Sequence, residues 1–504
     1  MILVLIKKLE VTSARYLSVT TRRSSMAHVL NYNNMNPHIR SMEFAVRGPI
    51  VIRGEQLEHE LKNGQIKSFS SIVRANIGDA HDMGQKPITW IRQILACASF
   101  PEFLKLSYIP HDVKTHVEEI LADCGGKSIG AYTKSAGIEC IRKHCANYIM
   151  ERDGIQADYN NIIISNGASE AIRNILKLFA NDQSPKQVGV MIPIPQYPLY
   201  SASLNEFNLA QIKYYLDEER NWGLSIDELE RAINEAKSKY DVKAICVINP
   251  GNPTAQVLTR QNIEEIIRFA HKNKLFILAD EVYQKNIHDP NSKFFSFKKV
   301  MKELGGDYKN YKDISVLIYS VELASFFSVS KGYMGECGIR SGYAELVNVD
   351  PKVIEALVKM ISARLCANSL GQIALDAAVN PPKQGDPSYE QWLEETTSIL
   401  SSMKERASLV QEAYSALEGI SCSPIQGAMY AMPKIELPIK AIKKAQTLNV
   451  QPDFFYGMQM LEETGICTVP GSGFGQREGT YHFRCKIFLL LLLKKCNKYQ
   501  KKLR

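Results

Sequence analysis

A lysine and an arginine stand close together in a segment made of small residues. Lys331 lies in Ser-Val-Ser-Lys-Gly, and Arg340 follows nine positions later with glycines around it. A lysine in such a loop, next to hydroxyls, can be desolvated and held near an electrophilic carbonyl, as Schiff-base chemistry requires. The arginine and the hydroxyls of Ser328 and Ser330 can hold a phosphate, because guanidinium binds phosphate oxygens in a bidentate manner. Taken alone, the segment also fits a glycine-rich loop with a solvated lysine.

Three further segments each close a predicted strand with residues suited to binding. Residues 166–170 (Asn-Gly-Ala-Ser-Glu) open a helix, and the free N–H groups of a helix N-terminus suit a phosphate. Residues 249–254 hold Asn252 between two prolines and a glycine. Asp280 and Tyr283 close a third strand, where an acid and a phenol can pair with a heterocyclic N–H and a ring oxygen. Each segment alone is also explained by helix capping or an ordinary turn.

These side chains need a framework that brings strand ends together. The strand candidates are continuous apolar runs at residues 161–166, 187–193, 243–249, 275–280 and 314–320. Continuous apolar character predicts strands buried on both faces, as in parallel sheets covered by helices. Residues 171–180 and 261–273 carry apolar side chains at helical spacing between them. The alternation predicts an α/β domain that binds ligands at the carboxyl ends of its strands.

Charge and composition exclude several classes of protein. The 504 residues carry a formal charge of +8, but residues 1–25 hold +4, residues 26–484 hold −3 and residues 485–504 hold +7. A near-neutral body argues against a nucleic-acid binder. The longest apolar run is seven residues, far below the ~20 that span a membrane. Eleven cysteines without a C-x-x-C pair indicate no zinc site and a reducing compartment.

The first 25 residues have the composition of a targeting segment. They are rich in Ser, Thr and Arg and contain Glu10 as their single acid. This composition predicts a mitochondrial presequence, with a disordered basic tail or a start at Met26 as alternatives. We therefore expect the protein in the mitochondrial matrix or the cytoplasm.

The ordered set of motifs resembles the fold-type-I pyridoxal phosphate (PLP) enzymes of the aspartate aminotransferase superfamily. Within that superfamily the chain is similar to the alanine aminotransferases over residues ~40–484. The strings that carry this similarity lie at residues 46–58, 75–96, 128–142, 193–202, 248–254, 330–338, 379–382 and 469–484. The resemblance implies a large domain, with a mostly parallel sheet flanked by helices, and a smaller α+β domain.

The resemblance also implies PLP as the cofactor and assigns its contacts. Lys331 matches the Schiff-base lysine, and Asp280 matches the acid that keeps the pyridine nitrogen protonated. Asn252 and Tyr283 match the groups that bond the ring's phenolic oxygen. Tyr197 matches the aromatic residue stacked on the ring, and we count it as catalytic together with Lys331 and Asp280. No metal is expected.

The remaining contacts concern the phosphate and the substrate. The phosphate cup is matched by Ala168, Ser169, Ser328 and Arg340. Arg484 matches the arginine that clamps the substrate α-carboxylate, with Asn252 beside it. Tyr132 matches the residue that reaches the phosphate from a partner subunit, which implies a homodimer.

Four regions are expected along the chain. Residues 1–25 form the presequence or tail, and residues 26–110 form an N-terminal arm with a segment of the small domain. Residues 111–380 form the large PLP-binding domain. Residues 381–504 form the C-terminal small domain, which begins after a loop-rich stretch with a long helix at 389–417.

The implied reaction is reversible transfer of an amino group between L-alanine and 2-oxoglutarate, giving pyruvate and L-glutamate. One alternative is a related aminotransferase that uses glyoxylate or another small amino acid. A second is a catalytically impaired homologue, because the C-terminus departs from the family.

Three departures from the family pattern stand out. Ala255 replaces a glycine of the family's turn, and Ala136 replaces a common glutamine. After Arg484 a leucine run followed by lysines replaces the family's strand and long amphipathic helix. We interpret this tail as an altered or truncated C-terminus. The alternative is a normally paired strand at 486–493 followed by a frayed, lysine-rich end.

Overall fold

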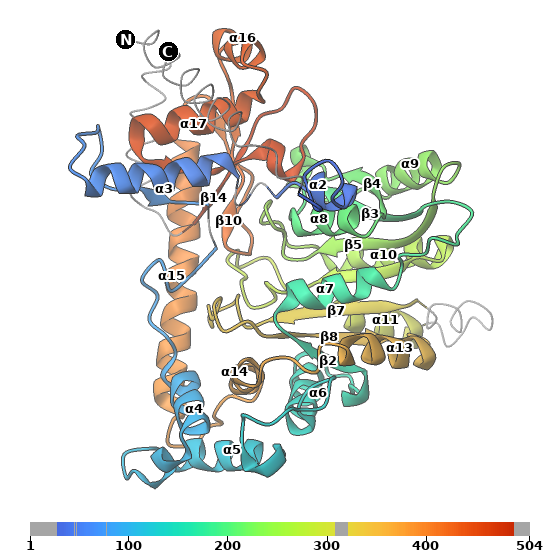
Figure 1. The fold of residues 1–504 in the computed structure, drawn as a ribbon, viewed down its shortest axis with the longest axis vertical. Coiled ribbons are helices and arrows are strands. Elements are labelled where there is room, and N and C mark those ends of the chain that lie inside the picture. The colour runs from blue at the N-terminus through green and yellow to red at the C-terminus, as the bar shows by residue number, and fades with distance from the viewer. Residues whose placement is uncertain (1–27, 45, 47, 77, 308–320, 488–504) are drawn as a thin grey trace. The chain divides into compact units, whose positions relative to one another are not determined.

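The computed structural model describes residues 28–44, 46, 48–76, 78–307 and 321–487 (Figure 1). The chain divides into two compact units, Met1–Met42 and Glu43–Arg504. In the first unit the described residues include one short helix, α2 (Pro37–Arg40), capped by the side chain of Asn36. Among the described residues no helix is both long and apolar enough to cross a membrane. The predicted presequence at residues 1–25 lies outside the described residues.

A seven-stranded sheet forms the centre of the second unit. Its strands, in spatial order, are β2 (Ile162–Ser165), β8 (Gly342–Val347), β7 (Leu323–Ser328), β6 (Phe276–Asp280), β5 (Asp241–Ile248), β3 (Val188–Ile194) and β4 (Ala210–Tyr215). β4, β3, β5, β6 and β7 run parallel, and only β8 is antiparallel to both of its neighbours within this sheet. The predicted α/β class with a mostly parallel sheet is confirmed.

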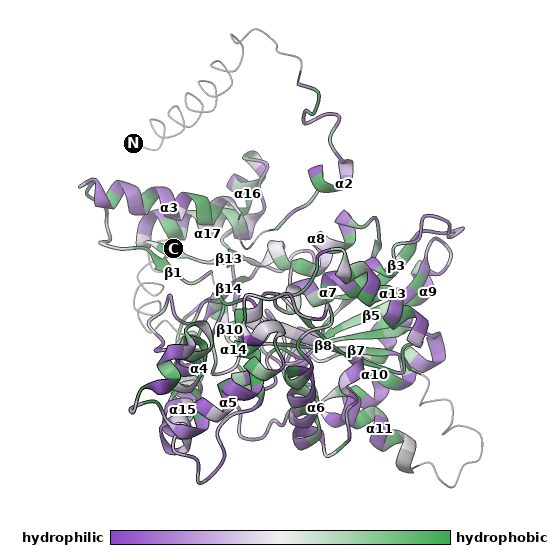
Figure 2. Cartoon of the chain, turned by 60° about the horizontal axis from the view of Figure 1, so that its bottom comes forward, coloured by the Kyte–Doolittle hydropathy of each residue, from purple (hydrophilic) through white to green (hydrophobic). Residues whose placement is uncertain are grey.

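Helices cover both faces of the sheet. Alternate residues of the strands accordingly belong to different hydrophobic clusters, one on each face. The helices are α4 (Thr89–Ser99), α5 (His111–Ala122), α6 (Glu139–Asp153), α7 (Ala168–Lys177), α8 (Leu199–Glu206), α9 (Ile226–Ala236), α10 (Arg260–Asn273), α11 (Phe297–Asp307), α13 (Pro351–Ser362) and α14 (Ser369–Val379). Met191 of β3 packs with α9 and α10, whereas Val190 and Ile192 pack with α7 and α8. Figure 2 shows the hydrophobic strands between helices of mixed hydropathy. The sheet is therefore buried on both faces.

The predicted strands at 161–166, 187–193, 243–249 and 275–280 are β2, β3, β5 and β6. The predicted strand at 314–320 lies outside the described residues, and the strand that leads to Lys331 is β7. The sequence analysis also missed β4 and β8. β4 is an edge strand whose residues alternate between buried and more exposed positions, so it lacks the continuous apolar run that marked the others.

A second group of elements combines segments near the start of the second unit with segments from its C-terminal part. The helices are α3 (Pro49–Lys62), α15 (Tyr389–Ser415), α16 (Ile439–Thr447) and α17 (Pro452–Thr464). The short strands are β1 (Val73–Arg74), β9 (Ile420–Ser421), β10 (Tyr430–Ala431), β11 (Lys434–Ile435), β12 (Ile466–Cys467), β13 (Val469–Pro470) and β14 (Phe483–Lys486). β1 pairs with β12, and β14 lies between β10 and β13. Residues near 70 and near 470 therefore share one core.

The long helix predicted at 389–417 is confirmed as α15, which runs alongside the sheet (Figure 1). The predicted domain boundaries near residues 110 and 380 stay predictions. In the C-terminal segment, β14 pairs normally through Lys486. The rest of the strand considered at 486–493 lies beyond residue 487 and outside the described residues.

Candidate active site

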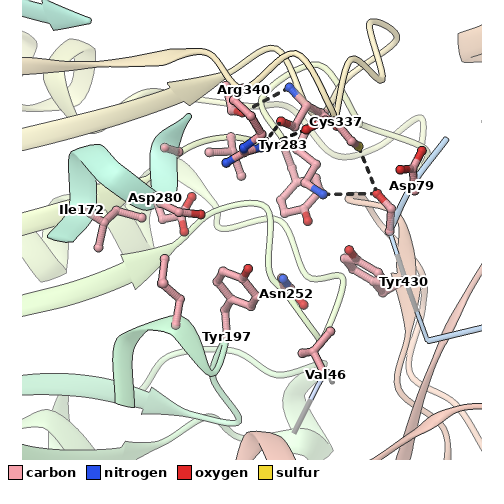
Figure 3. Close-up of a pocket in the computed structure, with 18 of the residues that line it drawn as sticks. Val46, Asp79, Ile172, Tyr197, Asn252, Asp280, Tyr283, Cys337, Arg340 and Tyr430 are labelled. Carbon is pink, nitrogen blue, oxygen red and sulfur yellow. Dashed lines mark hydrogen bonds between the residues drawn. The ribbon is translucent and has the colours of Figure 1, made fainter. Parts of the chain in front are cut away.

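Several strands end around one cavity of about 470 Å³ (Figure 3). Ten predicted site residues line it: Ala168, Ser169, Tyr197, Asn252, Asp280, Tyr283, Ser328, Lys331, Arg340 and Arg484. Most of them follow directly on the carboxyl ends of β2, β3, β5, β6 and β7. Because the carboxyl ends of parallel strands meet at one edge of a sheet, Ala168 and Lys331, 163 positions apart, face the same space.

The N-terminus of α7 and the guanidinium of Arg340 form one wall. The preceding Gly167 has φ 90°, and a Cβ there would lie 2.5 Å from Nη2 of Arg340, so only glycine lets the arginine approach. Arg340 Nη1 donates to Oγ of Ser330 (3.3 Å) and Nη2 donates to the carbonyl of Asn166 (3.3 Å). The unpaired N–H groups of a first helical turn, next to a guanidinium, make an anion site suited to phosphate.

Asp280 ends β6 and is buried, with 4% of its surface exposed. The hydroxyl of Tyr200 donates to Oδ2 of Asp280 (3.2 Å), while no described residue makes a hydrogen bond to the buried Oδ1. Burial raises the pKa of Asp280 to about 6. A buried carboxylate oxygen without a partner is costly, so this oxygen is suited to a cationic N–H donor.

The turn at residues 249–254 places Asn252 in the lining of the same cavity. Oδ1 of Asn252 accepts a hydrogen bond from Nη1 of Arg484 (3.1 Å). Tyr283 is buried nearby, and Tyr197 lines the cavity and makes a T-shaped contact with Phe44 (6.4 Å between ring centroids). An amide and two phenols therefore face the space that Asp280 borders.

The two substituted alanines differ in their consequences. Ala255 has φ 64°, the left-handed region, where a Cβ costs roughly 1–2 kcal/mol. The glycine expected there would avoid this cost. Ala136 contributes its carbonyl to a hydrogen bond from the Ile164 N–H (2.9 Å), a backbone contact that any residue can make.

Lys331 projects from the loop after β7 into the cavity. Its Nζ donates to the carbonyl of Gly78 (3.4 Å) and lies 5.9 Å from the ring centroid of Tyr283. Burial acts to lower the pKa of Lys331, but the neighbouring Tyr430 and Cys337 outweigh it and raise that pKa. The amine therefore lies among groups that shift its pKa.

Arg484 is buried between two aromatic rings. Its Cζ lies 4.1 Å from the ring centroid of Tyr430 and 4.7 Å from that of Phe474. Nη2 donates to the carbonyl of Asn76 (2.7 Å), and Nη1 donates to Asn252, whereas Nε has no partner among the described residues. A planar guanidinium held in this way is suited to a carboxylate.

Tyr200 and Tyr430 are site residues that the sequence analysis missed. Tyr200 bonds Asp280 from α8, and Tyr430 lines the cavity from the two-residue strand β10. Neither carries a sequence signal, because both contacts join segments far apart in the chain.

Tyr132 does not line the cavity and has 78% of its surface exposed. Its predicted role, which requires a partner subunit, stays a prediction. Among the described residues no group of His, Cys, Asp and Glu is arranged to hold a metal ion.

The sequence profile of aminotransferase class I and II matches residues 94–487. The chain belongs to this family. Among curated proteins, the chain is similar to alanine aminotransferase 2 of Xenopus tropicalis. The two are 53% identical over 91% of this chain and 86% of the relative. It is also similar to human alanine aminotransferase 1, 50% identical over 96% of this chain and 97% of the relative.

Other relatives extend the comparison. A protein of Dictyostelium discoideum named as a probable mitochondrial alanine aminotransferase is 43% identical over 90% of this chain and 85% of the relative. In solved structures the aminotransferase resembles an alanine aminotransferase from Pyrococcus furiosus, with a TM-score of 0.70 and 23% identity. The match covers 93% of this chain and all of that structure. It confirms the fold-type-I architecture.

Aminotransferases of this family depend on PLP, and the cavity fits that cofactor. The unpartnered Oδ1 of Asp280 suits a protonated pyridine nitrogen, and the α7 N-terminus with Arg340 suits the phosphate. Lys331 supplies the amine that a cofactor aldehyde requires. We therefore expect these three sets of contacts to hold PLP.

Replacing Arg340 by methionine tests the phosphate contact. Arg340→Met removes charge-assisted hydrogen bonds worth about 1.5–3 kcal/mol, so we expect PLP to bind about 10- to 100-fold more weakly. Titration of apoenzyme with PLP, followed by absorbance, measures this. Arg220→Met is the matched control, because the side chain of Arg220 is 83% exposed and outside the cavity. Equal affinities in both variants would refute the assignment.

Proposed function

We propose that this aminotransferase transfers an amino group reversibly between L-alanine and 2-oxoglutarate, producing pyruvate and L-glutamate. The observation that carries the proposal is the 50–53% identity to alanine aminotransferases over more than 90% of the chain. The cavity supports it, because Lys331 and Arg484 reach the same space from different parts of the fold.

Different residues of the cavity contribute to different steps of the proposed reaction. Bound PLP supplies an electron sink for the pair released when the Cα–H bond of the substrate breaks. Nζ of Lys331 takes the proton from Cα of alanine, and in the second half-reaction it returns a proton to Cα of the product glutamate. The amine is half-buried in the cavity lining, from where it can transfer the proton directly.

The α-carboxylate of the substrate is assigned to Arg484. Its guanidinium is fixed between the rings of Tyr430 and Phe474, so little side-chain freedom is lost on binding. Asn252, already bonded to Arg484, orients the same carboxylate. A substrate fixed at its carboxylate presents its Cα–H bond toward Lys331, which is the positioning that proton transfer needs.

Asp280 and Tyr197 would hold the cofactor ring, Asp280 at the ring nitrogen and Tyr197 by stacking. Asp280 holds a proton on the ring nitrogen through its free oxygen, and the Tyr200 bond fixes the orientation of the carboxylate. Tyr197 would cover the ring face and exclude water.

Removal of the lysine amine tests the assignment directly. Purified wild-type holoenzyme should form pyruvate from L-alanine and 2-oxoglutarate, and Lys331→Ala should lower that rate by at least roughly 10²–10⁴-fold, the share of a positioned acid–base group. A coupled assay for pyruvate measures both. Lys285→Ala, which removes a lysine that does not line the cavity, is the control.

The same assay separates the alternatives. Faster turnover with glyoxylate, aspartate or tyrosine pairs than with alanine would replace the proposed substrate. Tight PLP binding with no half-reaction on any amino donor would indicate an impaired homologue. Wild-type turnover by Lys331→Ala would refute the lysine assignment.

We further propose that the enzyme works as a homodimer in which Tyr132 of each subunit contacts the PLP phosphate of the other. The family resemblance supports this, as does the exposure of Tyr132 on the single chain. The phosphate cup would then be complete only in the dimer.

Mixed dimers test this sharing. Tyr132→Ala homodimers should bind PLP about 10-fold more weakly, because one hydrogen bond to a charged group is lost. A heterodimer of Tyr132→Ala and Lys331→Ala subunits, purified with two tags, should regain one site of wild-type PLP affinity and activity. Tyr108→Ala, a change at another exposed tyrosine, serves as the control. No recovery in the heterodimer would contradict shared sites.

We also propose that residues 1–25 direct the enzyme to the mitochondrial matrix and are removed there. The mass of the mature protein isolated from mitochondria should correspond to a chain that begins close to residue 26. A version that starts at Met26 should stay in the cytoplasm. An uncleaved chain found only in the cytoplasm would exclude the presequence.

A further inference from the structure

The backbone of Arg340, which lines the cavity (Figure 3), has an unusual conformation. Its φ is 61°, in the left-handed region, where the Cβ of any residue other than glycine is crowded. Such a conformation persists only where the surrounding structure holds it. The hydrogen bonds from the guanidinium to Ser330 and Asn166 orient the side chain, so the backbone must be held by other groups.

The side chain of Asn368 holds this backbone from the start of α14. Oδ1 of Asn368 accepts a hydrogen bond from the N–H of Gly371 (2.7 Å) and so caps the helix. Nδ2 of Asn368 donates to the carbonyl of Ile339 (3.2 Å) and to the carbonyl of Arg340 (3.3 Å). These carbonyls belong to the two peptide groups that flank Cα of Arg340. Because the orientations of these two groups define φ and ψ of Arg340, one amide group fixes both angles.

Asn166 connects Asn368 to the other half of the anion site. Oδ1 of Asn166 accepts a hydrogen bond from the backbone N–H of Asn368 (2.9 Å). Asn166 directly precedes Gly167, which begins α7, and its own N–H donates to Glu170 in the first turn of that helix (2.6 Å). Its carbonyl accepts from Nη2 of Arg340 (3.3 Å). The two asparagines therefore join the N-terminus of α7 to the arginine.

The first turn of α14 packs directly against these groups. A Cβ built on Gly371 would lie 2.6 Å from Nδ2 of Asn368 and 2.8 Å from the carbonyl oxygen of Arg340, so only glycine allows this approach. The segment between α13 and α14 has a second attachment, since Nη1 of Arg364 donates to Oε1 of Glu170 on α7 (2.6 Å). Two separate contacts thus hold the start of α14 beside the anion site.

We propose that Asn368 is a positioning residue for the PLP phosphate. Asn368 does not line the cavity and acts through its neighbours. It fixes the backbone of Arg340 and, through Asn166, the turn that precedes α7, so that the guanidinium and the free N–H groups of the helix converge on one anion. The inference rests on the phosphate assignment of Arg340 and deepens it, because it says what holds this arginine in place.

Asn368→Ser separates positioning from helix capping. Serine caps helices as well as asparagine does, but it has no amide to donate to the two carbonyls. Apoenzyme of this variant, titrated with PLP and followed by absorbance, should bind about 5- to 10-fold more weakly, because two exposed hydrogen bonds are lost. Its affinity for pyridoxal, which has no phosphate, should stay at the wild-type value. Equal losses for PLP and pyridoxal would indicate a general structural effect and would overturn the proposal.

The matched control is Asn273→Ser, which removes another amide that donates to a backbone carbonyl, that of Phe269 (3.0 Å), outside the cavity. It should leave both affinities unchanged.

A double-mutant cycle with Arg340→Met tests whether Asn368 acts through the arginine. In the Arg340→Met background, Asn368→Ser should weaken PLP binding by a clearly smaller factor than in wild type. Equal factors in both backgrounds would show that the two residues act independently and would overturn the proposal. Wild-type PLP affinity in Asn368→Ser, with a loss in Arg340→Met, would overturn the positioning role and leave the phosphate assignment intact. Wild-type affinity in Arg340→Met would refute the phosphate assignment and this inference with it.

Discussion

The buried carboxylate of Asp280 is the constraint on which the rest of the site depends. A charge at the end of a fully buried strand is stable only when donors compensate it, and Tyr200 satisfies one of its two oxygens. The other oxygen faces the cavity and requires a cationic partner. The sheet therefore specifies both the position and the charge of what binds, before any loop contributes a residue.

The two parts of the second unit contribute different chemistry to the cavity. The large sheet supplies the anion-binding turn, Asp280 and Lys331, whereas β14 and β10 supply Arg484 and Tyr430. The segment around Gly78 lies between them, since its carbonyl accepts a hydrogen bond from Lys331 Nζ and its missing side chain leaves room for Tyr430. The cationic side chains of the site line this one cavity, although residues 26–484 carry a net charge of only −3.

The sequence predicted the strand ends because fully buried parallel strands are continuous apolar runs, and polar residues stand out where such runs stop. Asp280 and Asn252 were found in this way, and the family resemblance gave Lys331, Arg340 and Arg484 their expected roles. β4 was missed because an edge strand alternates, and the contacts of Tyr200 and Tyr430 arise only from tertiary packing. Which residues of a second subunit complete the site is a property that one chain does not carry.

The left-handed turn at Ala255 connects two parts of the cavity wall. Its left-handed backbone directs the Ala255 carbonyl to the N–H of Gly427 (2.9 Å), and Gln426 Oε1 accepts from the N–H of Val257 (3.1 Å). The turn that carries Asn252 is thereby tied to the loop that leads into Tyr430, so both residues around Arg484 move together. The cost of roughly 1–2 kcal/mol at this alanine is comparable with the net contribution of the two hydrogen bonds, about 0.5–1.5 kcal/mol each, that fix the Arg484 side of the cavity.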